Sequence, residues 1–143
     1  IVATNAASIS TTIDGLLAEG IPPEKLVLGV PFYGHGWSGI AANDNGLHQS
    51  TEGATSLGAM TYRDIAANQL QSFERFWDEA GQVPWLYDAE SGTMITYEDA
   101  ESMARKAAYV IENGLGGIMI WELSQDTDAH DLLEAIDAGL RGE

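Results

Sequence analysis

Two short, almost unbroken apolar segments stand out in the pattern of hydrophobic and polar positions. The first, "KLVLGVPFYGHGW" (25–37), joins an apolar run to aromatic residues that are separated by glycine. The second, "GGIMIWELSQD" (116–126), reaches a tryptophan and then turns polar. A strand with one wet face alternates apolar and polar residues, whereas a strand buried on both faces is apolar throughout. The two segments therefore predict strands that are buried on both sides.

Helical periodicity surrounds both predicted strands. Residues 8–19 and 99–113 each repeat apolar side chains at helical spacing, and residues 129–140 do the same after the second strand. The N-cap candidates are Ser8 or Ser10 for the first helix and Asp99 for the second. The order helix–strand, then helix–strand–helix, predicts an α/β fold with a parallel sheet.

The stretch between Trp37 and Gly114 is far longer than a single crossover helix requires. Within it, "VPWLYD" and "MITYED" are separated by "AESG" and predict a hairpin rich in aromatic and β-branched residues. Residues 61–81 are expected to be helical in at least their first half. Residues from about 39 to 95 are therefore predicted to form a small α+β subdomain inserted after the first strand.

Candidate chemistry follows the two predicted strands, because ligands of α/β folds bind at the carboxyl ends of strands. Trp121 lies late in its strand, and its indole suits the apolar face of a sugar or another ring, unless it is simply a core residue. Tyr33, His35 and Trp37 alternate with glycines, so all three can face one side of an extended segment that a ligand approaches closely. Considered alone, His35 fits a hydrogen-bonded structural histidine better than a catalytic one.

The carboxylates after the second strand suggest an acid/base pair or a metal site. Because a strand alternates faces, Glu122 is expected to point away from whatever Trp121 faces. Asp126 and Asp128 fit a loop and a helix N-cap better than metal ligands. The sequence contains no Walker loop, dinucleotide fingerprint, nucleophile elbow or zinc signature, and we predict neither metal nor cofactor.

Composition narrows the class of partner. The chain has 143 residues, no cysteine and a formal net charge of −16, from 22 acidic and 6 basic residues. A protein that binds nucleic acid or an anionic membrane needs positive charge, so we expect neither as a partner. We expect a neutral ligand instead. No apolar run approaches the roughly 18 residues of a membrane span. The acidity indicates either a well-solvated surface or adaptation to high salt, which screens carboxylate repulsion.

Two ordered segments resemble a known family. "GIPPEKLVLGVPFYGHGW" and "ITYEDAESMARKAAYVIENGLGGIMIWELSQD" are closely similar to the last quarter of the family 18 glycoside hydrolases, the chitinases. "MTYRDI", "FWDEAGQVPWLYD" and "GTMITYEDAES" also follow the family pattern. The resemblance implies an α/β fold, the last part of a (β/α)8 TIM barrel that carries an inserted α+β subdomain. The implied division is barrel segment 1–38 (helix six, strand seven), chitinase insertion domain 39–95, and barrel segment 96–143 (helix seven, strand eight, helix eight).

The resemblance also implies roles for the aromatic residues. Trp121 resembles the tryptophan under the subsite where the sugar is distorted before cleavage, and Tyr33 and His35, with Trp37, resemble residues near the bound sugar. Many members carry arginine at the position of His35, and an imidazole is shorter and lacks the fixed charge of a guanidinium. The insertion would form a wall of the substrate groove. Candidates for this wall, for which packing roles are favoured, are Tyr62, Trp85 and Tyr87.

The family's catalytic motifs are absent from the printed sequence. Its acid ends a D-x-x-D-x-D-x-E motif, and its Tyr-Asp pair orients the acetamido group that attacks the anomeric carbon. The sequence has neither motif, since "LYDAES" lies inside the insertion, so we predict no catalytic residue in this chain. We expect the C-terminal part of a secreted chitinase, with chitin or chito-oligosaccharide and the missing N-terminal part of the catalytic domain as partners. The alternatives are a non-catalytic carbohydrate-binding or interaction module, and a piece without function of its own.

Overall fold

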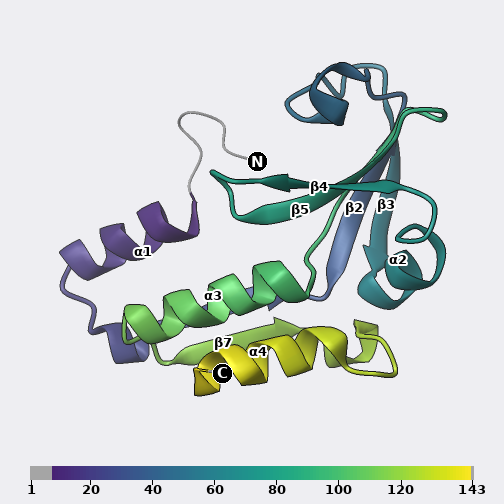
Figure 1. Cartoon of the computed structure of the whole chain (residues 1–143). Helices are drawn as coiled ribbons and strands as arrows, with labels where there is room; N and C mark the ends of the chain where they lie inside the picture. The colour runs from purple at the N-terminus through teal and green to yellow at the C-terminus, as the bar shows by residue number, and fades with distance from the viewer. Residues whose placement is uncertain (1–7, 143) are drawn as a thin grey trace.

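The computed structural model describes residues 8–142, which form two sheets with helices packed against them (Figure 1). The first seven residues of the predicted segment 1–38 lie outside the described residues. The helices are α1 (Ile9–Ala18), α2 (Tyr62–Asn68), α3 (Ala100–Glu112) and α4 (Asp131–Arg141). The strands are β1 (Val27–Pro31), β2 (Tyr33–Ser38), β3 (Thr55–Thr61), β4 (Glu74–Asp78), β5 (Val83–Asp88), β6 (Thr93–Thr96) and β7 (Gly117–Trp121).

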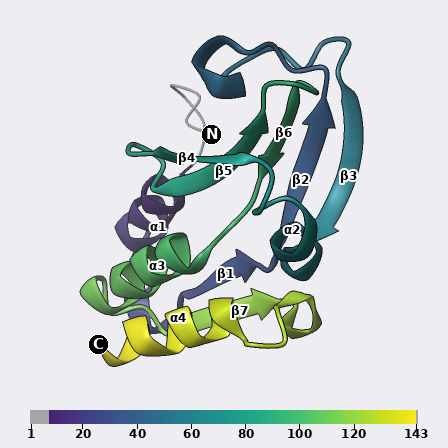
Figure 2. The same ribbon diagram turned by 45° about the vertical axis from the view of Figure 1, so that its right-hand side comes forward.

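The first sheet consists of β1 and β7, which pair in parallel from Val27 opposite Gly117 to Pro31 opposite Trp121. The predicted α/β architecture with parallel strands is thereby confirmed. Helices α3 and α4 run along the same two strands (Figure 2). The side chains of Leu28 and Val30 on that side are 7% and 2% exposed. This covered side belongs to the main core of the chain.

The predicted burial of these strands on both faces is wrong for this chain. Val27 is 56% exposed, Met119 49% and Trp121 62%, and all three project from the face opposite the helices. Among residues 8–142 no element covers this face. The unbroken apolar pattern correctly indicated a surface that avoids water, but a pattern does not say which protein covers it. We call the residues Val27, Met119 and Trp121 the open face.

The second sheet is antiparallel, with strand order β3-β2-β6-β5-β4. The predicted hairpin is confirmed as β5 and β6, and the predicted helix in the first half of 61–81 is confirmed as α2. The second half of that segment forms the edge strand β4. "YGHGW" belongs to the strand β2, so the antiparallel sheet begins at Tyr33 rather than at about residue 39.

A single residue, Phe32, separates β1 from β2 and joins the two sheets. Its side chain is fully buried, its N–H donates to the Trp121 carbonyl over 2.8 Å, and its carbonyl accepts from the Tyr62 N–H over 2.8 Å. The chain therefore changes sheets at a residue whose backbone groups are both paired. Pro31 and Gly34 flank this residue in the sequence, but the apolar run continues through it.

Gly34 is required by packing between the strand and its neighbours. A Cβ there would collide with the Thr96 carbonyl oxygen and approach the Ile65 side chain within 2.9 Å. The side of Gly34 where a Cβ would lie is therefore filled by protein, although Gly34 also lines the groove described below. Its burial allows β2 to pack closely against β6 and α2.

Side-chain caps begin two of the helices as the sequence predicted. Ser8 accepts from the Thr11 N–H over 3.1 Å, which decides between Ser8 and Ser10 as the N-cap of α1. Asp99 accepts from the Ser102 N–H over 3.0 Å at the start of α3. These bonds satisfy donors that lack partners in the first turn of a helix.

Two hydrophobic cores hold the molecule together. The main core takes residues from β1, β5 and β6 and from α2, α3 and α4, so it spans both sheets. The second core lies on the other side of the antiparallel sheet, under the segment that follows β2. Its buried members are Ile40, Trp85, Tyr87 and Met94.

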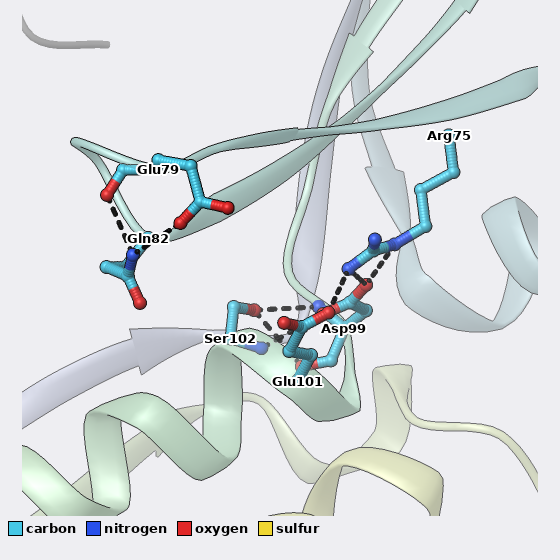
Figure 3. A network of polar contacts seen from close by, with 6 residues as sticks. All are labelled: Arg75, Glu79, Gln82, Asp99, Glu101 and Ser102. Atoms are coloured by element: carbon cyan, nitrogen blue, oxygen red, sulfur yellow. Dashed lines mark hydrogen bonds and ion pairs between the residues drawn. The ribbon is translucent and has the colours of Figure 1, made fainter.

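An ionic contact adds a second connection between the antiparallel sheet and α3. Figure 3 shows Arg75 of β4 reaching the start of α3, where it contacts Asp99 at 2.7 Å and Glu101 at 2.9 Å. Partial burial is the largest single contribution and lowers the pKa of the Arg75 guanidinium. The hydrogen bonds and negative charges of its carboxylate partners together outweigh burial, so the pKa is raised. Its guanidinium carbon also lies 5.2 Å from the centre of the Trp77 ring.

Candidate substrate groove

Strand β2 presents its three aromatic side chains on one face, as the sequence predicted. The ring centres of Tyr33 and His35 are 5.5 Å apart, and those of His35 and Trp37 are 6.2 Å apart. His35 is exposed, and its two neighbours are half-buried. The period of two along a strand explains this row, and pairing with both β3 and β6 keeps β2 extended.

A groove of about 350 Å³ opens beside this row. It runs from the end of β1 across β2 and β6 to the hairpin formed by β4 and β5. Its lining residues are Pro31, Tyr33, Gly34, His35, Leu47, Asp78, Val83, Pro84, Trp85, Met94, Thr96, Tyr97 and Glu98. The groove therefore collects aromatic, apolar and carboxylate side chains from segments that are far apart in sequence.

Trp85 forms a fixed aromatic surface in this groove. It is 7% exposed, its ring centre lies 5.4 Å from that of Phe76 in a stacked arrangement, and its indole N–H donates to the Asn45 carbonyl over 2.9 Å. Trp85 is thus both a packing residue and part of the lining. This position is compatible with the predicted role of Trp85 in the groove wall, which stays a prediction.

Two further candidates for the wall lie in the cores. Tyr62 is 6% exposed, and burial, followed by the negative charges of Asp131 and other aspartates, raises its pKa to about 12. Tyr87 is 4% exposed, and its hydroxyl donates to the Ile40 carbonyl over 2.9 Å. Neither side chain lines the groove described above. Packing explains both positions.

Trp121 lies on a different surface from the groove. It ends β7 on the open face, and a cis peptide bond joins it to Glu122. Its partner across the parallel pair is Pro31, which lines the groove. The structure therefore brings Tyr33, His35 and Trp85 together and leaves the indole of Trp121 as a separate, exposed platform connected to them through Pro31.

The carboxylates after β7 have protein partners. Asp126 is 2% exposed. Its carboxylate accepts from the Leu133 N–H over 3.0 Å and from the Leu132 N–H over 3.3 Å, both in the first turn of α4. Asp128 pairs with Arg63 at 3.2 Å, and Glu122 accepts from the Ser124 hydroxyl over 2.5 Å. Asp126 therefore lies in the loop and accepts from amides of the first turn of α4, but the N-cap residue of α4 is His130, so the expected N-cap role of these aspartates is wrong. In the part of the chain that the structure describes, no cluster of three potential metal ligands occurs.

Sequence reasoning missed the two carboxylates of the groove. Asp78 ends β4 and accepts from the Ala80 N–H over 2.9 Å, whereas Glu98 forms an ion pair with Lys106 of α3. The Glu98 and Lys106 side chains are only 11% and 12% exposed. No lysine or arginine lines the groove within the described residues. Only the tertiary fold places these carboxylates beside β2, so no local pattern reveals them.

The chemistry of this surface suits an uncharged ligand with flat apolar faces and several hydroxyl groups. Aromatic side chains can contact such faces, and carboxylates and backbone carbonyls can accept hydroxyl protons. The fold and groove together define an α/β protein in which an antiparallel sheet with an aromatic and acidic groove lies, in sequence, between two parallel strands. Comparison with known proteins identifies the family to which the chain belongs.

The sequence matches the family "Glycosyl hydrolases family 18" over residues 2–126. Chitinase A1 of Niallia circulans is 42% identical over 129 residues, which cover 85% of this chain and 18% of that protein. Chitinase B of Serratia marcescens is 34% identical over 156 aligned positions, which cover 90% of this chain and 31% of that protein. The chain belongs to glycoside hydrolase family 18, as the sequence resemblance indicated.

A solved structure agrees with this assignment. Chitinase ChiW of Paenibacillus sp. str. FPU-7 superposes with a TM-score of 0.88 at 34% identity, covering 100% of this chain and 13% of that one. The chain therefore spans less than a third of the length of each of these relatives. Among the described residues, no helix has both the length and the apolar character needed to cross a membrane.

Proposed function

We propose that this chain is the substrate-binding C-terminal part of a secreted chitinase that hydrolyses β-1,4-linked N-acetylglucosamine polymers. In this proposal Trp121 forms the floor under one sugar ring, and the groove along β2 forms a side wall. The observation that carries the proposal is the exposed indole of Trp121, which is 62% exposed and is paired through Pro31 with the groove that holds Tyr33 and His35.

The chemistry of chitin fits these surfaces. Each N-acetylglucosamine ring has an apolar face that stacks on aromatic side chains, and its hydroxyl and amide groups donate hydrogen bonds. Asp78 and Glu98 supply acceptors at one end of the groove. His35 supplies an imidazole that can donate or accept, at the position where many family members have arginine.

Catalysis in this proposal needs a group outside the printed sequence. The substrate's acetamido group attacks the anomeric carbon, and a carboxylic acid protonates the leaving oxygen. The sequence lacks the D-x-x-D-x-D-x-E motif that carries this acid in the family. Floor and wall then hold the sugar ring, while the acid is contributed by the N-terminal part of the catalytic domain.

The open face supports this partner. Val27, Met119 and Trp121 present apolar side chains to solvent at 49% exposure or more, next to each other on β1 and β7. Contiguous exposed apolar surface is typical of a protein interface. An independent carbohydrate-binding module would be expected to carry polar residues there. The remaining strands of a barrel would cover this face except where the sugar reaches Trp121.

A titration of chitohexaose into the ¹⁵N-labelled full chain tests the proposal. We expect shifts of the Trp121 indole N–H signal, and for Trp121→Ala a loss of at least about tenfold in affinity, because aromatic anchors dominate such contacts. Ile111→Ala is the matched control, since Ile111 is 56% exposed on α3 and lies outside the proposed site. Equal affinity of Trp121→Ala and the unsubstituted chain would contradict the proposal.

A further inference from the structure

Arg63, at the start of α2, contacts the loop that follows Trp121. Its Nε donates to the Asp126 carbonyl over 2.9 Å, and its Nη2 lies 3.2 Å from an Asp128 carboxylate oxygen. The guanidinium thus holds two successive points of the loop between β7 and α4. This contact joins the unit that carries the groove to the loop that begins at the proposed floor.

Asp126 makes this contact rigid on the loop side. The residue is 2% exposed, and its carboxylate accepts from the Thr127 N–H over 2.8 Å and from the Leu133 N–H over 3.0 Å. The loop therefore cannot move at Asp126 without breaking the bonds that begin α4. Arg63 grips the carbonyl of a residue that is already fixed by its own side chain.

Phe32 closes the connection at the other end of the loop. Its N–H donates to the Trp121 carbonyl, and its carbonyl accepts from the N–H of Tyr62, the residue before Arg63. A closed ring results, running along the backbone from Trp121 to Asp126, across to Arg63, and back through Tyr62 and Phe32. We call it the Arg63 ring.

The ring is tied directly to the groove. Tyr33 is paired with Thr61 across β2 and β3, and Arg63 follows Thr61 by two residues. The distance between Tyr33 and the Trp121 loop is therefore set by two short connections, one through Phe32 and one through Arg63. Without the second connection, the groove and the Trp121 loop would be joined only through Phe32.

We propose that Arg63 is a positioning residue that fixes the Trp121 loop relative to the groove and so sets the spacing between floor and wall. The significance for sugar binding rests on the proposed function, whereas the ring itself does not. The Arg63 side chain is 51% exposed and its partner Asp128 95%, so the ion pair contributes little to folding stability. The consequence of the contact is local geometry.

Arginine suits this position better than lysine. A guanidinium can donate from Nε and from Nη2 at the same time in a fixed planar arrangement, whereas an ammonium group is a single point charge on a flexible chain. The two acceptors here are a backbone carbonyl and a carboxylate, which a planar fork can bridge. Arg63→Lys should therefore restore the charge but only part of the restraint.

The test uses the indole N–H signal of Trp121 in the ¹⁵N-labelled full chain, assigned with Trp121→Phe. For Arg63→Ala we expect a shifted, broadened signal and about tenfold faster hydrogen exchange of the Phe32 amide, because the loop opens locally. Asp128→Asn keeps the Nε contact and should leave both readouts close to those of the unsubstituted chain. Arg63→Lys should give an intermediate result.

Arg75→Ala is the matched control, because it removes another guanidinium that joins the antiparallel sheet to a helix, at the start of α3. We expect it to leave the Trp121 signal unchanged. An unchanged Trp121 signal in Arg63→Ala, or an equal change in Arg75→Ala, would overturn the positioning role. Failure of the unsubstituted chain to bind chitohexaose would instead contradict the proposed function, while the signal of Trp121 would still decide the role of Arg63.

Discussion

The two sheets differ in how they are covered. The antiparallel sheet has the main core on one face and the second core, with Ile40 and Trp85, on the other. The parallel sheet has the main core on one face and the open face on the other. The apolar pattern of the strands in the sequence did not distinguish a sheet covered on both faces from a sheet covered on one face. The difference indicates that the antiparallel sheet packs against cores on both faces within the described residues, whereas β1 and β7 present a surface suited to further protein.

The largest expected effect separates covered from open positions. Leu86 is fully buried in the main core, so Leu86→Ala should lower the free energy of unfolding by about 2–5 kcal/mol through lost burial and a cavity. Met119 is 49% exposed on the open face, and Met119→Ala should change it by less than about 0.5 kcal/mol. Urea denaturation of the full chain measures both. Equal losses would show that the open face is buried in solution.

Asp126 and Asp128 sharpen the comparison within a single loop. Asp126→Ala removes the acceptor for donors at the start of α4 and should cost about 1–2 kcal/mol of stability. Asp128→Ala removes an exposed ion pair and should cost about 0.5 kcal/mol or less. Thermal unfolding of the two variants gives the comparison. A larger loss for Asp128→Ala would reverse the roles assigned to these aspartates.

The contact between Arg75 and α3 tests whether ionic contacts add to the shared core in holding the sheet and helix together. Arg75→Ala should lower stability by about 1 kcal/mol, because it leaves the half-buried Asp99 without its cation. Arg75→Lys should recover part of this loss, since it keeps the charge but not the fork. Chemical denaturation at low and at molar salt provides the measurement. A stability difference that is the same at both salt concentrations would contradict an ionic origin.

A further test is the pH dependence of stability on the covered side. The pKa of Tyr62 is raised to about 12, mainly by burial, above the ordinary value of 10.0. Because the folded-state pKa is the higher one, the contribution of Tyr62 is complete below about pH 10 and is lost as pH rises towards 12. Tyr62→Phe should therefore flatten the decline in stability between these pH values. Identical slopes for the variant and the unsubstituted chain would count against burial as the cause.

Local signals carried most of the successful predictions. Ser8 and Asp99 were found because a cap needs only the side chain and the backbone three residues on. The hairpin of β5 and β6 was found because its strands are rich in aromatic and β-branched residues and lie close together in sequence. The row formed by Tyr33, His35 and Trp37 follows from strand periodicity alone.

Features that depend on distant contacts were not predictable in this way. The change of sheet at Phe32 occurs within a continuous apolar run, and no glycine or proline separates α2 from β4. Glu98 lines the groove and pairs with Lys106 of α3, an arrangement that only the tertiary fold creates. The exposure of Val27 and Met119 could not be read from the sequence, since an apolar pattern indicates a need for cover and not its source.

The central claim is that this chain holds chito-oligosaccharide without cleaving it. The most direct measurement combines chitohexaose binding, followed at the Trp121 indole signal, with assay of new reducing ends in the same sample. We predict binding that Trp121→Ala weakens and no reducing ends above the level of buffer alone, because the acid motif is absent from the sequence. Turnover of chitohexaose by the chain alone would contradict this account.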